Sequence, residues 1–183
     1  ASLLPKLRGG SPLHRAVING YDKTGITIMY MDSGMDNGDI IKQKSVAINI
    51  DDNVGVIHDK LSIMGRDLLL DVLPSIFDKT NSRVKQDENE VTFAFNIKRE
   101  EEKLDFNKTA LEVHNQIRGM YPFPTAYTTL NGEIIKICKS EIGNEVKGEC
   151  GCIKNIYNDG IGVVCSDREI IITRLKPAGK KEM

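Results

Sequence analysis

The sequence carries almost no net charge, no long hydrophobic run and few cysteines, and each of these shortages excludes a class of protein. Lys and Arg total 25 and Asp and Glu total 26, a formal charge of -1, so no overall basic field predicts nucleic acid binding by the whole chain. No apolar run reaches the roughly 18 residues that a transmembrane helix needs, and no signal peptide opens the chain. We therefore expect a globular, cytoplasmic protein that does not enter a membrane, and the hydrophobic content of 40% is enough for a core.

All four cysteines lie in the second half of the chain, and they do not have the spacing of a metal site. Each of the four, Cys138, Cys150, Cys152 and Cys165, falls in an alternating or apolar run, where Cys behaves as a small buried hydrophobe. Cys150 and Cys152 are too close in sequence for an easy disulfide, and no second pair at zinc-site spacing accompanies them. The sequence therefore predicts reduced thiols and no metal.

The acidic stretch 31–40, MDSGMDNGDI, places three carboxylates and two glycines between two apolar, β-branched runs. These runs, 24–30 and 40–50, predict strands, so the acidic stretch is expected to be a loop at a strand end. Its carboxylates belong to Asp32, Asp36 and Asp39. They can serve as acceptors, metal ligands or a base, or they can form an Asx-rich turn between paired strands, and composition alone leaves both open.

Helical patterns flank this loop on both sides. Ser11-Pro12 predicts a short helix that Gly20 ends, and Asp51 or Asp52 is expected to cap a long helix whose apolar residues recur every three or four positions. The order helix, strand, strand, helix with a glycine-rich loop is typical of the second half of an open α/β sheet, where ligands bind beyond the carboxyl ends of strands. These elements supply too few strands for such a sheet, so we expect further chain before the first residue.

The composition changes in the middle of the chain. A highly charged stretch with one apolar patch, 91–97, is interpreted as a linker in which the patch forms a strand or an anchoring contact. Asn107 or Thr109 is expected to cap a helix, after which five or so short strands with turn signals predict a small closed or nearly closed β-barrel. The predicted domains are 1–80, the linker 81–102 and 103–183.

Six segments, in order, resemble those of the methionyl-tRNA formyltransferase family. In the first half they are the SLLPKLRGG run from Ser2, the TGITI run from Thr24 and the MDSGMDNGD run from Met31. In the second half they are Leu104-Asp105-Phe106, Ile117-Arg118 with Tyr121-Pro122-Phe123-Pro124, and Gly179-Lys180-Lys181. No single segment is decisive, but six in the same order are specific, and the resemblance covers essentially the whole chain.

The resemblance implies the C-terminal part of a Rossmann-like α/β catalytic domain, followed by an OB-like β-barrel that helps to hold a tRNA. It implies transfer of the formyl group of 10-formyltetrahydrofolate to the α-amino group of methionyl initiator tRNA, for translation initiation, and we expect a monomer. Asp36 takes the position of the family's catalytic Asp. The segment that lines the folate pocket corresponds to Ser2, Leu3, Leu4 and Pro5. Candidates for tRNA phosphate contact are Arg118, Arg174, Lys176, Lys180 and Lys181.

The family's catalytic set also contains an Asn and a His, from an NxH motif that runs directly into the SLLP segment. Both would lie immediately before Ala1 and are absent from this sequence. The attacking amine must lose a proton and an oxyanion forms on the formyl oxygen, tasks that suit a His paired with a carboxylate and an amide donor. We therefore predict that the 183-residue chain alone is inactive.

Two other functions stay open on the sequence. One is formyl transfer to an amino-sugar nucleotide, because the sugar-nucleotide enzymes carry a related barrel. Transfer to glycinamide ribonucleotide is disfavoured, because that family usually lacks the barrel. The other is a non-catalytic nucleic-acid-binding module, in which the missing NxH motif would be real. The open reading frame before Ala1 discriminates these, since Asn-x-His there supports an enzyme.

Overall fold

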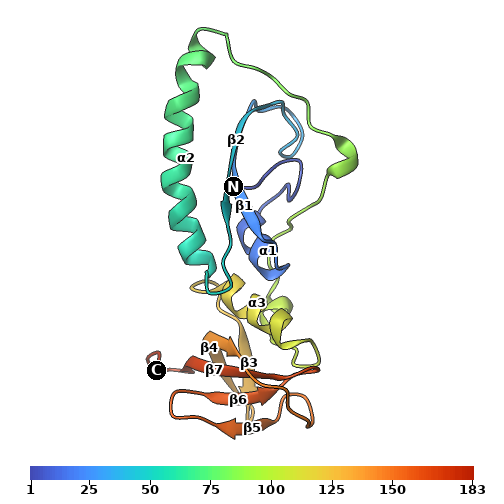
Figure 1. Cartoon of the computed structure of the whole chain (residues 1–183), viewed down its shortest axis with the longest axis vertical. Coiled ribbons are helices and arrows are strands. Elements are labelled where there is room, and N and C mark those ends of the chain that lie inside the picture. Colours follow the sequence, from blue (N-terminus) through green and yellow to red (C-terminus); the bar gives the residue numbers. More distant parts are fainter. The chain divides into compact units, whose positions relative to one another are not determined.

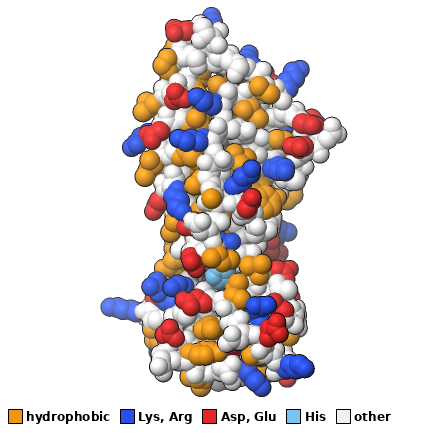
Figure 2. All heavy atoms as spheres, in the orientation of Figure 1, with side chains coloured by type: hydrophobic (Ala, Val, Ile, Leu, Met, Phe, Trp, Pro, Cys, Tyr) orange, Lys and Arg blue, Asp and Glu red, His pale blue; other side chains and the backbone are white.

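The computed structural model describes all 183 residues, and they divide into two compact units (Figure 1). The first unit contains residues 1–16 and 21–96, and the second contains residues 17–20 and 97–183. The chain contains both helices and strands, in keeping with the predicted α/β class. None of the helices is long and apolar enough to cross a membrane. Acidic and basic side chains are interspersed over the face shown in Figure 2.

The first unit is built on a two-stranded antiparallel sheet, β1 (Lys23–Met29) and β2 (Ile40–Ala47). β1 contains Ile and Thr, and β2 contains Ile and Val. The branched side chains of these residues favour extended backbone. Met29 pairs with Ile40 at one end of the ladder, so the acidic stretch forms the loop between the strands. The two predicted strands are therefore confirmed, although the second ends three residues early. The short helix α1 (Pro12–Ile18) precedes β1, also as predicted.

The long helix α2 (Val54–Phe77) packs against both strands of this sheet. Its buried residues recur along one face: Val54, Ile57, Leu61, Leu68 and Val72. Gly65 also faces the sheet, because a Cβ at this position would lie 3.5 Å from Ile26 Cδ1. Helix and sheet can therefore approach closely at the glycine, and tertiary packing of one face supplies most of the stability of such a helix.

The N-cap of α2 differs from the prediction. The side chain of Asn53, and not that of Asp51 or Asp52, accepts a hydrogen bond from the Val56 N–H at 3.0 Å. The Asp52 carboxylate instead accepts two bonds of 2.8 Å from Lys60 Nζ. Asp and Asn are equally good N-cap residues, so the ion pair with a lysine about two turns into the helix decides between them.

The charged segment predicted as a linker lies for most of its length along the first unit. The backbones of Ile40 and Val84 exchange two hydrogen bonds of 2.8 and 2.9 Å. Further along, Arg8 N–H donates to Thr92 O at 2.9 Å, and Ala94 N–H donates to Arg8 O at 2.8 Å. The apolar patch of this segment therefore makes an anchoring contact, which is one of its two predicted roles, and is not a strand of either sheet.

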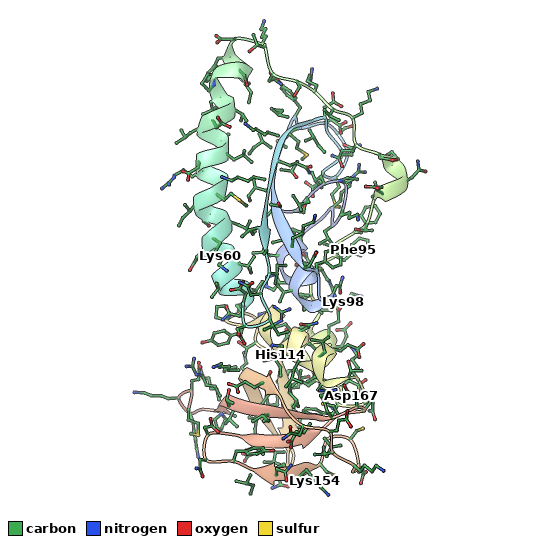
Figure 3. All side chains as sticks on the ribbon, viewed as in Figure 1. Lys60, Phe95, Lys98, His114, Lys154 and Asp167 are labelled. Carbon is green, nitrogen blue, oxygen red and sulfur yellow. The ribbon has the colours of Figure 1, made fainter.

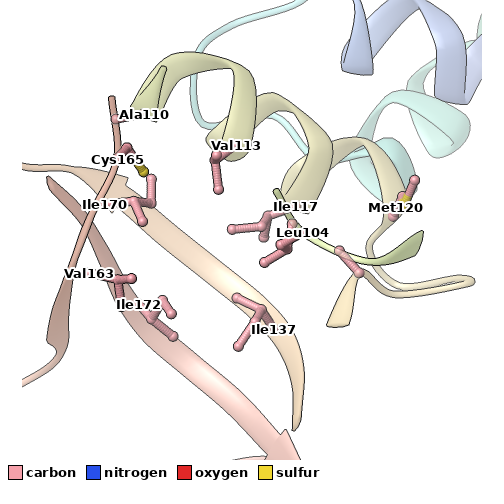
Figure 4. Packing of buried hydrophobic residues seen from close by; sticks show 11 residues of the cluster. Leu104, Ala110, Val113, Ile117, Met120, Ile137, Val163, Cys165, Ile170 and Ile172 are labelled. Carbon is pink, nitrogen blue, oxygen red and sulfur yellow. The ribbon is translucent and has the colours of Figure 1, made fainter. Parts of the chain in front are cut away.

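The second unit combines helix α3 (Ala110–Met120) with a five-stranded antiparallel sheet in the order β3-β4-β7-β6-β5. The strands are β3 (Tyr127–Leu130), β4 (Glu133–Ile142), β5 (Ile153–Ile156), β6 (Ile161–Val164) and β7 (Glu169–Pro177). Thr109, one of the two predicted caps, accepts a hydrogen bond from Glu112 N–H at the start of α3. Eleven buried residues form one core, in which Val113 and Ile117 of the helix face the sheet (Figure 4).

The sheet of the second unit curls around this core but does not close. Strands β3 and β5 are its two edges, and no ladder joins them. A cavity of about 90 Å³ is lined by residues of both edge strands, among them Leu130 and Ile153. The closed or nearly closed barrel predicted from the number of strands is thus not confirmed, and the sheet forms half of a barrel.

Candidate active site

Asp36, the predicted catalytic residue, lies in the loop that joins β1 to β2, and a neighbouring loop holds its carboxylate. Asp36 Oδ2 accepts a hydrogen bond of 2.8 Å from the backbone N–H of Gly9. The backbone of Asp36 has a φ of 52°, in the left-handed region that Asp tolerates better than most residues. One carboxylate oxygen is therefore committed to a backbone donor, and Oδ1 is left for another partner.

A second set of contacts holds the acidic loop through its backbone. Gln86 Nε2 donates to the carbonyl oxygens of Asp36 and Gly38, both at 2.8 Å. Gln86 Oε1 accepts from Arg8 Nη2 at 2.8 Å and from Arg8 Nε at 3.1 Å. Arg8 is only 5% exposed and also pairs with Glu88 at 2.9 Å. The acidic loop is thus tied to two segments that are distant from it in the sequence.

Turn chemistry accounts for the other conspicuous residues of the loop. A Cβ at position 38 would fall 1.7 Å from Tyr30 O, so only glycine fits there. Asp32 Oδ1 accepts a hydrogen bond from Gly34 N–H at 2.7 Å, which is an Asx turn. The carbonyl oxygen of Asp39 accepts from Tyr30 N–H at 2.9 Å and closes the loop. The Asx-turn alternative is therefore correct for Asp32, while the Asp36 side chain contacts a different segment.

The segment expected to line a folate pocket is anchored to both strands of the first sheet. The Ser2 carbonyl accepts a hydrogen bond of 2.7 Å from a threonine hydroxyl of β1, and the Leu4 carbonyl accepts one of 2.8 Å from Gln43 of β2. Ser2 and Leu4 are buried, whereas Leu3 and Pro5 are half-buried. Leu3 and Pro5 are therefore the residues of this segment that can offer surface to a ligand.

The α-amino group of Ala1 lies within electrostatic reach of Asp36. Desolvation lowers the pKa of this amine, and the Asp36 carboxylate opposes that shift by raising it. A titratable base held at this point would have its protonated form stabilised by the same carboxylate. The site thus presents one fixed carboxylate beside a position at which a second group can be held.

The cationic residues expected to contact phosphate lie in the second unit, and the structure separates one of them from the rest. Arg118 of α3 is buried at 7% exposure, and its Nε donates to Asn115 Oδ1 at 2.9 Å. The other four are exposed, on β7 or after it: Arg174, Lys176, Lys180 and Lys181. Arg118 is therefore poorly placed for a phosphate, whereas these four side chains are accessible.

Two pairs of like charges face each other across β4 and β7. Lys136 is the cross-strand partner of Lys176, and Lys139 is the partner of Arg174. Like charges directly opposite each other destabilise an antiparallel pair. Two acidic side chains offset part of this repulsion, since Glu182 Oε1 lies 3.2 Å from Arg174 Nη1 and Glu141 Oε1 lies 3.6 Å from Lys139 Nζ. An anionic ligand on this face would relieve the remainder.

Comparison with known families agrees with this geometry. Residues 1–73 match the sequence profile of formyl transferases, and residues 96–183 match the profile of the formyl transferase C-terminal domain. The chain belongs to the formyl transferase family. The second profile begins close to where the second unit resumes at residue 97, whereas the first profile ends within α2, before the end of the first unit.

The relatives of this formyl transferase chain include two from bacteria. The methionyl-tRNA formyltransferase of Macrococcus caseolyticus is 50% identical over 183 residues, and that of Staphylococcus epidermidis is 49% identical over 184 residues. Each comparison covers 100% of this chain and 59% of the relative. The chain therefore spans about three fifths of the length of these relatives.

Solved structures give the same fold. The N-formyltransferase of Helicobacter canadensis, solved with folinic acid and dTDP-3-aminofucose, superposes with a TM-score of 0.76 at 26% identity, over 94% of this chain and 63% of that one. A methionyl-tRNA formyltransferase from Clostridium thermocellum gives a TM-score of 0.59 at 21% identity, over 78% of this chain and 61% of that one. The second likeness concerns the fold alone.

Two residues that hold the acidic loop of this formyl transferase chain were not among the predicted site residues. Arg8 lies between Lys6-Leu7 and a glycine pair, and its partners Gln86 and Glu88 are 78 and 80 residues away. Gln86 lies in a charged stretch and gives no local signal, because its two acceptors are 48 and 50 residues away. A motif can therefore locate Asp36 but not the side chain that fixes the loop around it.

The cysteines are all unpaired thiols, and two of them are buried in the second unit. Burial raises the pKa of Cys138 to about 11 and that of Cys165 to about 12. Both are therefore protonated at neutral pH. Cys152 differs from the expected burial, because it is exposed. No three His, Cys, Asp or Glu side chains converge to hold a metal ion.

Proposed function

We propose that this chain forms part of an enzyme that transfers the formyl group of 10-formyltetrahydrofolate to the α-amino group of methionyl initiator tRNA. The observation that carries the proposal is the match over the whole chain, at 49% and 50% identity, to methionyl-tRNA formyltransferases. Because those relatives are longer than this chain, the activity is proposed for a protein of their full length. In that protein the first unit would contribute to a Rossmann-like domain, and the half-barrel would be related to OB folds.

The reaction exchanges one carbon–nitrogen bond for another. The methionine nitrogen bonds to the formyl carbon, the bond from that carbon to N10 of the folate breaks, and the amine proton passes through a base to the leaving nitrogen. We assign to Asp36 the role of orienting that base and stabilising its charged form, as the third member of a triad does. The Gly9 N–H occupies Oδ2 and leaves Oδ1 to accept a hydrogen bond from such a base, which supports this role. A residue attached to Ala1 would begin beside this carboxylate, where the NxH motif is expected.

The residues of the 2–5 segment fit a folate in a limited way. Leu3 and Pro5 can provide an apolar wall for a flat ring, while Ser2 and Leu4 fix the backbone behind it. The Ser2 and Leu4 carbonyls are already hydrogen-bonded to the sheet, so other residues must bind the polar edges of the ring. When bound, 10-formyltetrahydrofolate supplies the formyl group.

The second unit is proposed to hold the tRNA through phosphate contacts. The exposed cations Arg174, Lys176, Lys180 and Lys181 are the candidates. For Arg174 and Lys176, the support is the like-charge pairing with Lys139 and Lys136 across β4 and β7, which the neighbouring carboxylates offset only in part. Each neutralised phosphate releases counterions, so this surface would make binding depend on salt. Arg118 is assigned a structural role within α3 instead.

One solved structure favours a second candidate function, formyl transfer to an amino-sugar nucleotide. The Helicobacter canadensis enzyme, which superposes with a TM-score of 0.76, was solved with an amino-sugar nucleotide. Its likeness to this chain covers 94% of the residues, but at 26% identity the match is weaker than that to the methionyl-tRNA enzymes. Transfer to the amine of a sugar nucleotide uses the same bond exchange and would need the same carboxylate.

The test is formyl transfer by a protein extended to the length of its relatives, with Asp36→Asn as the variant. We expect the rate with methionyl-tRNA to fall by about 10²–10⁴, because general-base catalysis contributes on that order. Asp32→Asn is the matched control, since it changes an aspartate of the same loop and retains the acceptor oxygen of the Asx turn.

Equal losses in Asp32→Asn and Asp36→Asn would contradict the role of Asp36, because they would point to disruption of the loop. An extended protein that formylates an amino-sugar nucleotide and not methionyl-tRNA would keep the chemistry and replace the substrate. An extended protein inactive on both amines would leave a nucleic-acid-binding module.

A further inference from the structure

Phe93 and Phe95 form an exposed aromatic pair on the segment that is anchored along residues 8–11. Their ring centroids are 5.6 Å apart and the ring planes differ by only 11°, so the rings are stacked. Phe93 is 53% exposed and Phe95 is 65% exposed, whereas Ala94 between them is fully buried. Alternation of extended backbone therefore puts both rings on the solvent side. Two stacked phenyl rings left in water call for a partner, because burial of such rings is strongly favourable.

The aromatic pair lies close to the candidate catalytic carboxylate. A Cβ on Gly9 would lie 2.9 Å from Ala94 O, so the backbones of these residues are in contact. Gly9 also donates its N–H to Asp36. Ala94, the residue between Phe93 and Phe95, therefore contacts Gly9, and Gly9 holds the Asp36 carboxylate. Phe95 lies on the stretch of this segment nearest α1 (Figure 3), where its carbonyl oxygen accepts a hydrogen bond of 3.1 Å from Arg15 Nε.

We propose that Phe93 and Phe95 are a stacking platform for the unpaired 3′-terminal bases of an aminoacylated RNA. The inference rests on the proposed function, because an amine carried on the terminal ribose can approach Asp36 only if the last nucleotides pass close to that residue. Aromatic side chains bind unpaired bases by stacking and tolerate any sequence. The near-parallel rings provide a flat surface for such a base, and the Arg15 guanidinium places a positive charge beside it.

The form of the platform favours an RNA end over the folate. Small-molecule sites are concave and bury most of the ligand, with polar groups placed at its edges. Phe93 and Phe95 are more than half exposed and lie on the outer side of an extended segment. A nucleotide held by stacking on one face can leave its base edges in water, and its backbone continues into the rest of the RNA. A pterin ring would lose the contacts that its polar edges require.

The test measures binding of this chain to a short single-stranded RNA that ends in CCA and carries 2-aminopurine at its last position. Stacking of this base on an aromatic ring quenches its fluorescence, and a blunt duplex of similar length is the comparison RNA. Phe93→Leu with Phe95→Leu should weaken single-strand binding by about tenfold or more, because stacking is lost. The Tyr double variant keeps the rings and should bind within about twofold of wild type. Phe77→Leu, which alters another exposed Phe of the same unit, is the control.

Loss of quenching in the Leu variant alone supports the platform. Unchanged binding in that variant, an equal loss in Phe77→Leu, or self-association of the wild type that the Leu changes abolish would each overturn it. The binding assay needs no formyl donor. A negative result in it would therefore reject the platform without rejecting the proposed formyl transfer. In the extended protein, the Leu variant should raise KM for methionyl-tRNA without lowering kcat. Formyl transfer to tRNA with an unaltered KM would reject the platform and keep the function.

Discussion

The two units of this chain are stabilised internally by different kinds of interaction. The second unit gathers eleven buried residues into one core between α3 and a five-stranded sheet. The first unit rests one helix on two strands and uses polar ties, such as that from Arg8 through Gln86 to the acidic loop. A two-stranded sheet is marginal without further strands or a packed helix. The second unit should therefore be the more stable of the two, and the candidate catalytic loop belongs to the weaker one.

The outer face of α2 sharpens this contrast. Val56, Ile63, Leu70 and Phe77 follow one another at intervals of seven residues and are 40%, 58%, 62% and 76% exposed. A spacing of seven keeps side chains on the same side of a helix. The first unit thus has an unburied apolar stripe in addition to its buried one. These apolar side chains are not buried within the unit, so they do not contribute to its stability.

The largest expected effect comes from truncating a core residue of each unit. Ile117 is 1% exposed in the core of the second unit, and Ile117→Ala should cost about 2–5 kcal/mol of unfolding free energy. Leu61 is 3% exposed under α2, and Leu61→Ala should cost near the lower end of that range, because the thinner first unit can relax around the gap. Urea unfolding with hydrogen exchange resolved along the chain assigns each loss to its unit.

Equal costs for the two substitutions would contradict the contrast between the units. A loss of exchange protection in both units from either substitution would show that they unfold as one. Ile117→Val and Leu61→Met are the conservative controls, and each should cost no more than about 1.5 kcal/mol.

The sequence was a good guide to local structure and a poor one to partners. The apolar periodicity of residues 54–77 predicts α2, and Thr109 is correctly identified as a possible cap of α3. The choice of Asn53 over its two acidic neighbours depends on Lys60, which competes for one of them. Whether the five strands close into a barrel depends on contact between β3 and β5, which no local pattern encodes.

The candidate site follows the same rule. The motif around Asp36 identifies the residue, and the turn chemistry of Asp32 is readable within three residues. The donor that holds Asp36 is Gly9, 27 residues away in the chain, and Gln86 is 50 residues away. Arg118 is a phosphate candidate as one of the cations of the second domain, but its burial depends on how the helix packs.

A smaller expected effect is a dependence of the stability of the second unit on pH. Glu169 is fully buried in the second unit, and its carboxylate accepts hydrogen bonds from Tyr157 and from Asn155, the latter at 2.8 Å. Burial raises the pKa of Glu169, but these hydrogen bonds outweigh it and hold the pKa below its usual range. The stabilisation is therefore present above the unfolded pKa of about 4.3 and is lost as pH falls through the lower folded value.

Glu169→Gln should cost about 1–3 kcal/mol at neutral pH, because a charged acceptor is lost and an amide must fit between two donors. The cost should shrink as pH falls below about 4, since the wild type then loses the same interaction. Glu145→Gln, at a side chain that is 85% exposed, is the control and should be neutral. A cost independent of pH would mean that Glu169 acts through packing alone.

The smallest effects concern the two caps, and they test most directly whether the units are independent. Asn53→Ala removes the acceptor at the start of α2 and Thr109→Ala removes the one at the start of α3, each at a cost of about 1 kcal/mol. Hydrogen exchange should quicken in α2 alone for the first change and in α3 alone for the second. Asn53→Ser and Thr109→Ser keep an oxygen at the cap and should restore protection. Because α2 starts from the lower stability, the same 1 kcal/mol should open a larger fraction of its molecules, and an equal response in both helices would mean that the units share one stability.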